Sequence, residues 1–131
     1  MKKIYLSGPI RGKLDLNRAA FDRAGEFADG RGWSSVNPLD LIFRDPDDIR
    51  EVMGACIDTL LGCDAILMLD GWNVSRGALA EFYVARSIEM PDYHMTADVK
   101  SQRLPDISVK LETADIPAGA ITDHTAKGIY T

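Results

Sequence analysis

The chain has 131 residues, which is enough for one domain with its own core and too few for two domains of ordinary size. Hydrophobic residues make up 46% and charged residues 27%, a balance typical of globular proteins and not of disordered chains. The 15 Lys and Arg against 20 Asp and Glu give a formal net charge of −5, which argues against a broad basic surface for duplex nucleic acid. The net charge does not exclude a small anion-binding pocket, because such a pocket needs only a few local donors.

The cysteines, histidines and apolar runs exclude further classes of protein. Cys56 and Cys63 lie seven residues apart and His94 and His124 thirty apart, so the spacing indicates neither a disulfide framework nor a metal site. The apolar run at the N-terminus is too short for a signal peptide. No apolar stretch approaches the roughly 20 residues that span a bilayer. We therefore expect a cytoplasmic protein without a membrane partner.

Short apolar runs alternate with amphipathic stretches over the first 95 residues. We expect strands at 4–7, 33–36, 65–69 and 93–95, and helices at about 15–29, 45–62 and 76–88. Leu16 and Ile49 are expected on the inward faces of the first two helices. The run 65–69 is apolar throughout and bounded by acids, as in a buried parallel strand. The alternation predicts an α/β fold with a mostly parallel sheet of about four or five strands, covered by helices on both faces.

Ligands of such sheets bind at the carboxyl ends of the strands, so the loops after Ser7, Val36 and Leu69 are expected to build the site. Residues 96–131 lack strong periodicity, apart from a strand-like alternation at 107–111. We interpret 96–131 as an irregular C-terminal extension of the domain formed by residues 1–95. A neighbouring subunit is one candidate for what orders it.

The first motif directly follows the strand at 4–7 and has the sequence Ser7-Gly8-Pro9-Ile10-Arg11-Gly12. Its two glycines allow a tight turn and a close approach of the backbone to a ligand. Backbone N–H groups together with a guanidinium suit a phosphate. An ordinary strand-to-helix turn with a surface arginine explains the same spacing about as well.

The second motif follows the strand at 65–69 and runs Asp70-Gly71-Trp72-Asn73-Val74-Ser75-Arg76-Gly77. Ser75 stands where the N-cap of the third helix is expected. Its hydroxyl and the N–H groups of Arg76 and Gly77 form a positive helix end that suits an anion, although a capped helix after a turn explains Ser75 equally. Asp70 lies at the carboxyl end of the strand, and Trp72 could stack on a base or cover the sheet edge.

Glu81 lies on the packing face of the third expected helix. Its helical neighbours are all small or apolar: Gly77, Ala78, Val84, Ala85 and Ile88. Burial raises the pKa of such a carboxyl, whereas a helix N-terminus or a nearby arginine lowers it. A partly buried carboxylate in a sheet-edge crevice is a candidate nucleophile. The alternative is a structural glutamate bonded to the backbone or to an arginine.

Two weaker catalytic candidates and one core residue complete this set. Tyr5 lies in the first strand, with its ring in the core and its hydroxyl within reach of the turn. Asp58 has small or apolar helical neighbours, so we expect it to face inward. Cys56 lies on the inward stripe of the second helix and is interpreted as packing.

Three segments, taken together and in order, resemble a known family over about residues 3–95: Tyr5-x-Ser7-Gly8-x-Ile10-Arg11-Gly12, Cys63-Asp64-Ala65 and Gly71-Trp72-x-x-Ser75-x-Gly77-Ala78-x-x-Glu81. They are similar to the nucleoside 2-deoxyribosyltransferase superfamily. The likeness is greatest to its small, phage-common DUF4406 branch and to the 2′-deoxynucleoside 5′-phosphate N-hydrolases. The resemblance implies a flavodoxin-like doubly wound fold, a homodimer or larger homo-oligomer, a small-molecule nucleotide as partner, and no metal or organic cofactor.

The resemblance also implies roles for individual residues. Glu81 would attack the anomeric carbon of the sugar and displace the base, and water or a second base would then release the glycosyl group. Tyr5 would position the glutamate or the sugar, and the turn from Gly8 to Gly12 would hold a 5′-phosphate together with Ser75. Relatives that act on free nucleosides tend to carry an acid at the position of Ser75, which would repel a phosphate. A serine there therefore favours a nucleoside 5′-monophosphate.

One position departs from the pattern of this branch. The branch often carries an aspartate eight residues before Asp64, as the acid on the base side, and Cys56 stands there in this chain. The nearest acid is Asp58, about 200° further around the helix. Asp58 as a catalytic acid is one hypothesis. The alternative is a non-catalytic nucleotide-binding or sensing module on the same fold.

Overall fold

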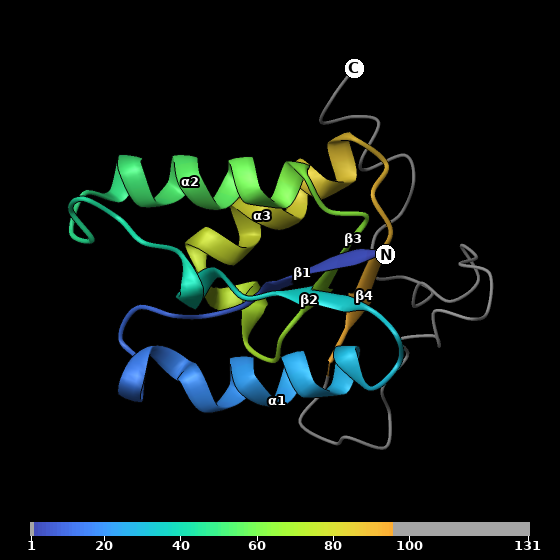
Figure 1. Cartoon of the computed structure of the whole chain (residues 1–131). Helices are drawn as coiled ribbons and strands as arrows, with labels where there is room; N and C mark the ends of the chain where they lie inside the picture. Colours follow the sequence, from blue (N-terminus) through green and yellow to red (C-terminus); the bar gives the residue numbers. More distant parts are fainter. Residues whose placement is uncertain (1, 96–131) are drawn as a thin grey trace.

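A four-stranded parallel sheet forms the middle layer of the computed structural model, which describes residues 2–95 (Figure 1). The strands are β1 (Lys3–Ser7), β2 (Ser34–Val36), β3 (Ala65–Met68) and β4 (Asp92–His94), in the spatial order β2-β1-β3-β4. Each neighbouring pair is parallel, as expected from strands that alternate with helices. The strand expected at 107–111 lies outside the described residues, and the domain boundary expected at residue 95 lies at their end. Both stay predictions.

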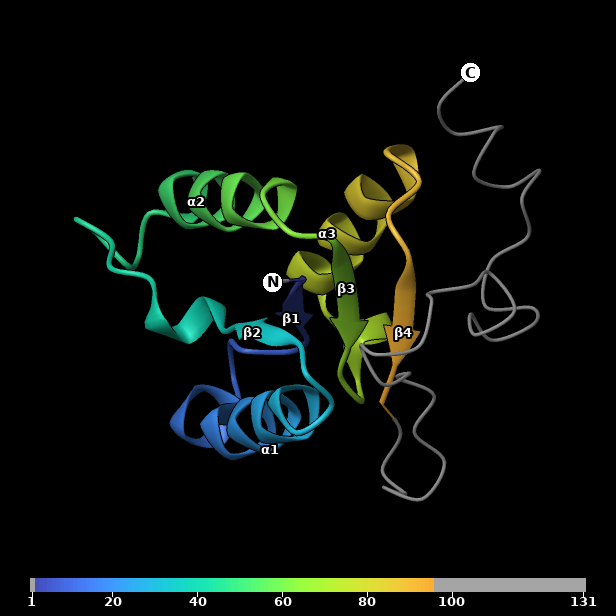
Figure 2. The same ribbon diagram turned by 45° about the vertical axis from the view of Figure 1, so that its right-hand side comes forward.

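The helices cover both faces of the sheet. They are α1 (Arg18–Asp29), α2 (Ile49–Leu61) and α3 (Arg76–Ser87). Helix α1 lies on one face, and α2 and α3 lie together on the other (Figures 1 and 2). The strand order reverses at β1, because the chain places β2 on one side of it and β3 on the other. The loops after β1 and β3 therefore lead to helices on opposite faces, which makes the β1–β3 edge the topological switch point.

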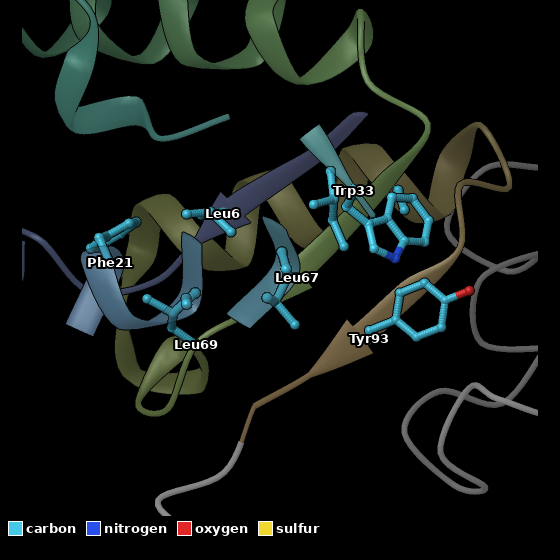
Figure 3. Packing of buried hydrophobic residues seen from close by; sticks show 10 residues of the cluster. Leu6, Phe21, Trp33, Leu67, Leu69 and Tyr93 are labelled. Carbon is cyan, nitrogen blue, oxygen red and sulfur yellow. The ribbon is translucent and has the colours of Figure 1, made fainter. Parts of the chain in front are cut away.

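Alternating side chains of the strands belong to two separate hydrophobic cores, one on each face of the sheet. Ile4, Leu6 and Leu67 pack with Phe21 and other residues of α1 (Figure 3). Tyr5, Ile66 and Met68 pack instead against α2 and α3. Because strand side chains alternate between faces, odd-numbered positions of β1 point toward α2 and α3. Tyr5 and Ser7 therefore lie on the same face as α3.

The first helix begins later than its periodicity suggested. The expected start was residue 15, but Asp15, Leu16 and Asn17 have positive φ values of 48°, 54° and 62°, and α1 begins at Arg18. These left-handed residues interrupt the helix and change its phase. The prediction that Leu16 faces inward is wrong, since it is 50% exposed, whereas Phe21 is fully buried.

The first turn of α2 is likewise more exposed than expected. Asp48 caps this helix, and its Oδ1 accepts hydrogen bonds from the N–H groups of Arg50 and Glu51 at 3.0 and 3.3 Å. The start of α2 extends beyond the ends of the strands (Figure 1). Ile49, in this first turn, is 61% exposed, contrary to the prediction. Cys56 is buried, as its place on the inward stripe indicated.

Gly8 is required by close packing. A Cβ atom at this position would lie 2.8 Å from the Cβ of Leu69, so the Gly8→Ala variant must displace one of the two strand ends. We expect a loss of about 1–3 kcal/mol in the free energy of unfolding, measured by urea denaturation. Gly54→Ala is the matched control, because a Cβ there meets nothing within 4 Å and alanine is the better helix former. A Gly8→Ala variant as stable as Gly54→Ala would contradict this account.

Candidate active site

The two sequence motifs meet at the switch point between β1 and β3. The N–H of Leu69 donates to the carbonyl oxygen of Ser7 at 2.7 Å, which continues the pairing of the strands into the loops. Gly71 has a φ of +86°, and a Cβ there would lie 3.3 Å from Cγ of Pro9. Glycine at this turn therefore permits both the backbone conformation and the close contact between the loops. Motifs that are distant in sequence form one end of the sheet, as expected from its topology.

Glu81 lies directly over β1 and is buried, with 7% of its surface exposed. The hydroxyl of Tyr5 donates to Oε2 at 2.5 Å, and the hydroxyl of Ser7 donates to Oε1 at 2.6 Å. Helix α3 brings the carboxylate to these partners across 76 and 74 positions of sequence. The prediction that Glu81 lies on the packing face is confirmed. Among the residues that the structure describes, its side-chain partners are hydroxyl groups, and neither the backbone nor an arginine is found in the place expected for a purely structural glutamate.

Burial dominates the electrostatics of this cluster. It raises the pKa of Glu81 above its usual range, while the hydrogen bonds from Ser7 and Tyr5 act in the opposite direction. The pKa of Tyr5 is raised far above its ordinary value, first by burial and then by the charge of Glu81. Tyr5 therefore remains neutral and keeps its proton to donate.

Cys56 belongs to the same cluster. Its side chain, on α2, packs in the same buried core cluster as Tyr5. Burial raises the pKa of Cys56 and keeps the thiol protonated. Cys56 is thus a core residue, as interpreted from the sequence, that packs beside the candidate catalytic group.

The turn after β1 holds the other residues expected around a phosphate. Pro9 is buried, and its carbonyl oxygen accepts a hydrogen bond of 2.9 Å from Nδ2 of Asn17. Ile10 packs against the core on the α1 side. Arg11 and Gly12 are exposed, and Gly12 has a φ of +78°. The guanidinium is therefore free to approach a ligand at the open side of the turn.

The second motif ends in a capped helix. The hydroxyl of Ser75 accepts a hydrogen bond of 3.3 Å from the N–H of Ala78, which confirms the N-cap prediction. Arg76 and Asp70 are exposed. A Cβ at Gly77 would meet nothing within 4 Å, so there is open space beside the first turn of α3. An anion could approach this helix end without steric obstruction.

Trp72 lies over the aromatic side chains beside this helix end. Its ring centroid lies 4.7 Å from that of Phe82 and 5.5 Å from that of His94. Trp72 is partly buried in this packing. Of the two roles that the sequence left open, covering the sheet edge is the one that these contacts favour.

A cluster of polar side chains around Asp92, which the sequence pattern did not single out, lies next to Trp72, whose ring contacts that of His94. Asp92 is fully buried, with Oδ1 3.0 Å from Nη1 of Arg86 and Oδ2 2.7 Å from Nε2 of His94. Asp92 and His94 are two residues apart on a strand and so share a face, which is the one local signal available. The approach of Arg86 depends on how α3 packs on β4.

Asp58 does not join the candidate site. It is exposed on α2, and the prediction that it faces inward is wrong. Cys56 and Leu60 define the inward face of this helix, and a residue two positions after Cys56 lies about 200° around it. Small neighbours on a helix indicate an inward face only where that helix is covered, and this side of α2 is open.

Between residues 2 and 95, no group of three or more His, Cys, Asp or Glu side chains is arranged to hold a metal ion. Within the same range, no helix is long and apolar enough to cross a membrane.

The order of the strands and the placement of the helices define a doubly wound α/β protein with its candidate site at the switch point. A solved structure with this fold is a 2-deoxyribosyltransferase from Leishmania mexicana, with a TM-score of 0.62 and 18% sequence identity over 99% of this chain and 97% of that one. The expected flavodoxin-like architecture is confirmed.

Sequence comparison identifies the family directly. Residues 2–92 match the model of the family described as Domain of unknown function (DUF4406), and the chain belongs to this family. No curated protein sequence matches the chain.

The raised pKa of Glu81 predicts how stability depends on pH. A carboxyl with a higher pKa in the folded state binds its proton more tightly there than in the unfolded chain. Its stabilising contribution is therefore present at low pH and is lost as pH rises through the folded pKa. We expect the free energy of unfolding of the wild type, relative to Glu81→Gln, to fall as pH rises from 4 toward neutrality.

Urea denaturation at a series of pH values measures this difference. Glu26→Gln, which removes an exposed charge from α1, controls for the general effect of losing a carboxylate. A wild type that gains stability relative to Glu81→Gln over this range would contradict the assignment.

Proposed function

We propose that this protein cleaves the N-glycosidic bond of a (deoxy)nucleoside 5′-monophosphate, with Glu81 as the nucleophile. The observation that carries this proposal is the Glu81 carboxylate, buried beside the switch point and held by the hydroxyls of Tyr5 and Ser7. The turn from Gly8 to Gly12 begins at the residue after Ser7. A sugar whose phosphate is bound at that turn would have its anomeric carbon near the carboxylate.

The chemistry follows from a desolvated carboxylate with neutral partners. One oxygen of Glu81 forms a bond to C1′ as the bond from C1′ to the base nitrogen breaks, and the base leaves with that electron pair. Water then attacks C1′ as the bond from C1′ to Glu81 breaks, which regenerates the carboxylate, and the proton that the water loses goes to the departed base. A second base that attacks C1′ in place of water loses its ring N–H proton in the same way and gives transfer. Burial leaves the carboxylate poorly solvated, so less water has to be removed from it before attack. Tyr5 keeps one oxygen in place without neutralising the charge.

Arg11 and the first turn of α3 are proposed to bind the 5′-phosphate. The guanidinium is exposed on the turn after β1, and the space beside Gly77 is open. Ser75 presents a neutral hydroxyl at this helix end, where an acid would repel a phosphate. Charge-assisted hydrogen bonds from arginine and from backbone N–H groups suit this ligand.

The comparison with a solved structure supports the fold on which the proposed reaction depends. The solved structure that shares this fold is by its name a 2-deoxyribosyltransferase, an enzyme that transfers a deoxyribosyl group. At 18% identity this likeness supports the fold, and the assignment of chemistry depends on Glu81 and its partners. We propose that residues 1–95 form the domain that performs it, acting as a homodimer or larger homo-oligomer.

A second candidate is a nucleotide-binding module without catalysis. Two observations favour it. Cys56, which is not an acid, stands where the related branch often carries an aspartate, and Asp58, the nearest acid, is exposed and does not face the candidate site. The two functions differ in whether a bound nucleotide is recovered intact.

Base release from a panel of nucleoside 5′-monophosphates, followed by liquid chromatography, tests the reaction. We expect Glu81→Ala to lower the rate by about a thousandfold or more, because it removes the nucleophile. Tyr5→Phe retains the nucleophile and is expected to have a smaller effect. Equal rates in wild type and Glu81→Ala would contradict the assignment. Calorimetric binding of a nucleotide that stays intact after long incubation would select the second candidate.

The phosphate contacts can be tested with Arg11→Ala. We expect KM for a nucleoside 5′-monophosphate to rise about 10- to 100-fold, as for loss of a hydrogen bond to a charged group, with little change for the corresponding nucleoside. Lys13→Ala is the matched control, since it removes an exposed positive charge two residues further along the loop. An equal effect of Arg11→Ala on nucleotide and nucleoside would show that the arginine does not recognise the phosphate.

A further inference from the structure

We propose that Ser7 is a positioning residue for Glu81: its hydroxyl holds Oε1 and fixes the plane of the carboxylate, and it does not contact the substrate. This inference rests on the proposed function of Glu81 as the nucleophile. It changes the role expected for Ser7, which the turn motif placed among the substrate-binding residues.

The burial of Ser7 favours this role. Its side chain is fully buried, and its hydroxyl donates to Glu81 at 2.6 Å. A hydroxyl has a single hydrogen, so Ser7 cannot donate to a phosphate or sugar without releasing Glu81. Full burial also keeps its oxygen away from a ligand in the open part of the site.

The backbone around Ser7 is fixed. Ser7 pairs with Met68 in the β1–β3 ladder, and its carbonyl oxygen accepts a hydrogen bond of 2.7 Å from the N–H of Leu69. The next residue, Gly8, packs so closely on Leu69 that a Cβ there would lie 2.8 Å from that of the leucine. The position of the hydroxyl is therefore set by the sheet and not by a flexible loop.

Two hydrogen-bond donors, one on each oxygen, fix the orientation of the Glu81 carboxylate, which a single donor would not fix. The last torsion of a glutamate side chain is broad, so a single hydrogen bond leaves the carboxylate free to turn about its axis. Tyr5 holds Oε2 and Ser7 holds Oε1, from the same face of β1. Together they fix the plane of the carboxylate and the direction in which it can attack a sugar carbon.

The same hydrogen bond affects protonation. Donation from Ser7 stabilises the ionised carboxylate and opposes the rise in the pKa of Glu81 that burial causes. The other titratable groups that face this carboxylate are Tyr5 on β1 and Cys56 on α2, and both have raised pKa values and stay neutral. The residues three and four positions away from Glu81 on α3, which are Gly77, Ala78, Val84 and Ala85, carry no charge. Removing the Ser7 hydroxyl should therefore raise the pKa of Glu81 further.

Ser7→Ala is the test, with two readouts. We expect kcat to fall about tenfold with KM within twofold of the wild type, and the rising limb of the pH profile of kcat to move to higher pH. Independently of activity, the carboxyl carbon of Glu81, followed by NMR in glutamate-labelled protein and assigned with Glu81→Gln, should titrate at higher pH in Ser7→Ala. Ser87→Ala is the matched control, because its hydroxyl donates to Val84 O on α3, 2.6 Å away.

Two results would overturn the inference. One is an unchanged Glu81 titration together with unchanged kcat. The other is a rise in KM at constant kcat, which would make Ser7 a substrate contact. If the wild type cleaves no nucleotide, the proposed function fails, and the NMR titration still decides whether Ser7 controls Glu81. Should Ser7→Ala not fold, Ser7→Cys keeps the size with a weaker donor, and a smaller shift in the same direction is expected.

Discussion

The burial of the Glu81 carboxylate against β1 is the interaction on which the candidate site depends. Taking a carboxylate out of water costs free energy unless hydrogen bonds replace its solvation. Here Tyr5 and Ser7 supply these bonds from one strand. Helix α3 must therefore pack at one register along β1, since a shift would leave the carboxylate without its donors. The same hydrogen bonds therefore fix both the position of α3 along β1 and the geometry of the candidate site.

The chemical character of the site follows from the neutrality of those partners. An arginine beside Glu81 would hold it ionised but would also neutralise its charge. Hydroxyl donors orient the oxygens; in the proposed reaction they leave the negative charge available to a sugar carbon that becomes positive as the base departs. Tyr5 and Cys56, both with raised pKa values, add no competing charge. The buried ion pair of this region, between Asp92 and Arg86, instead joins α3 to β4.

The fold supplies the location, and the side chains supply the proposed reaction. Doubly wound sheets leave a crevice wherever the strand order reverses, and in this protein the reversal lies between β1 and β3. Gly8 and Gly71 allow the two loops to pack together there. The same architecture supports unrelated functions in other proteins, so a fold shared with a 2-deoxyribosyltransferase cannot by itself assign a reaction to this protein.

Local patterns in the sequence determined the succession of strands and helices along the chain, the buried strand that begins at residue 65, the cap at Ser75 and the position of Glu81 on the inward face of its helix. Each of these depends on periodicity or on a single turn of backbone. Tertiary packing alone decided the rest. Tyr5 and Ser7 meet Glu81 across more than 70 positions, and Asp58 faces solvent because that side of α2 is uncovered. The delayed start of α1 likewise depends on left-handed residues in a loop tied to Pro9. Contacts between distant segments depend on how the layers pack, which no local pattern records.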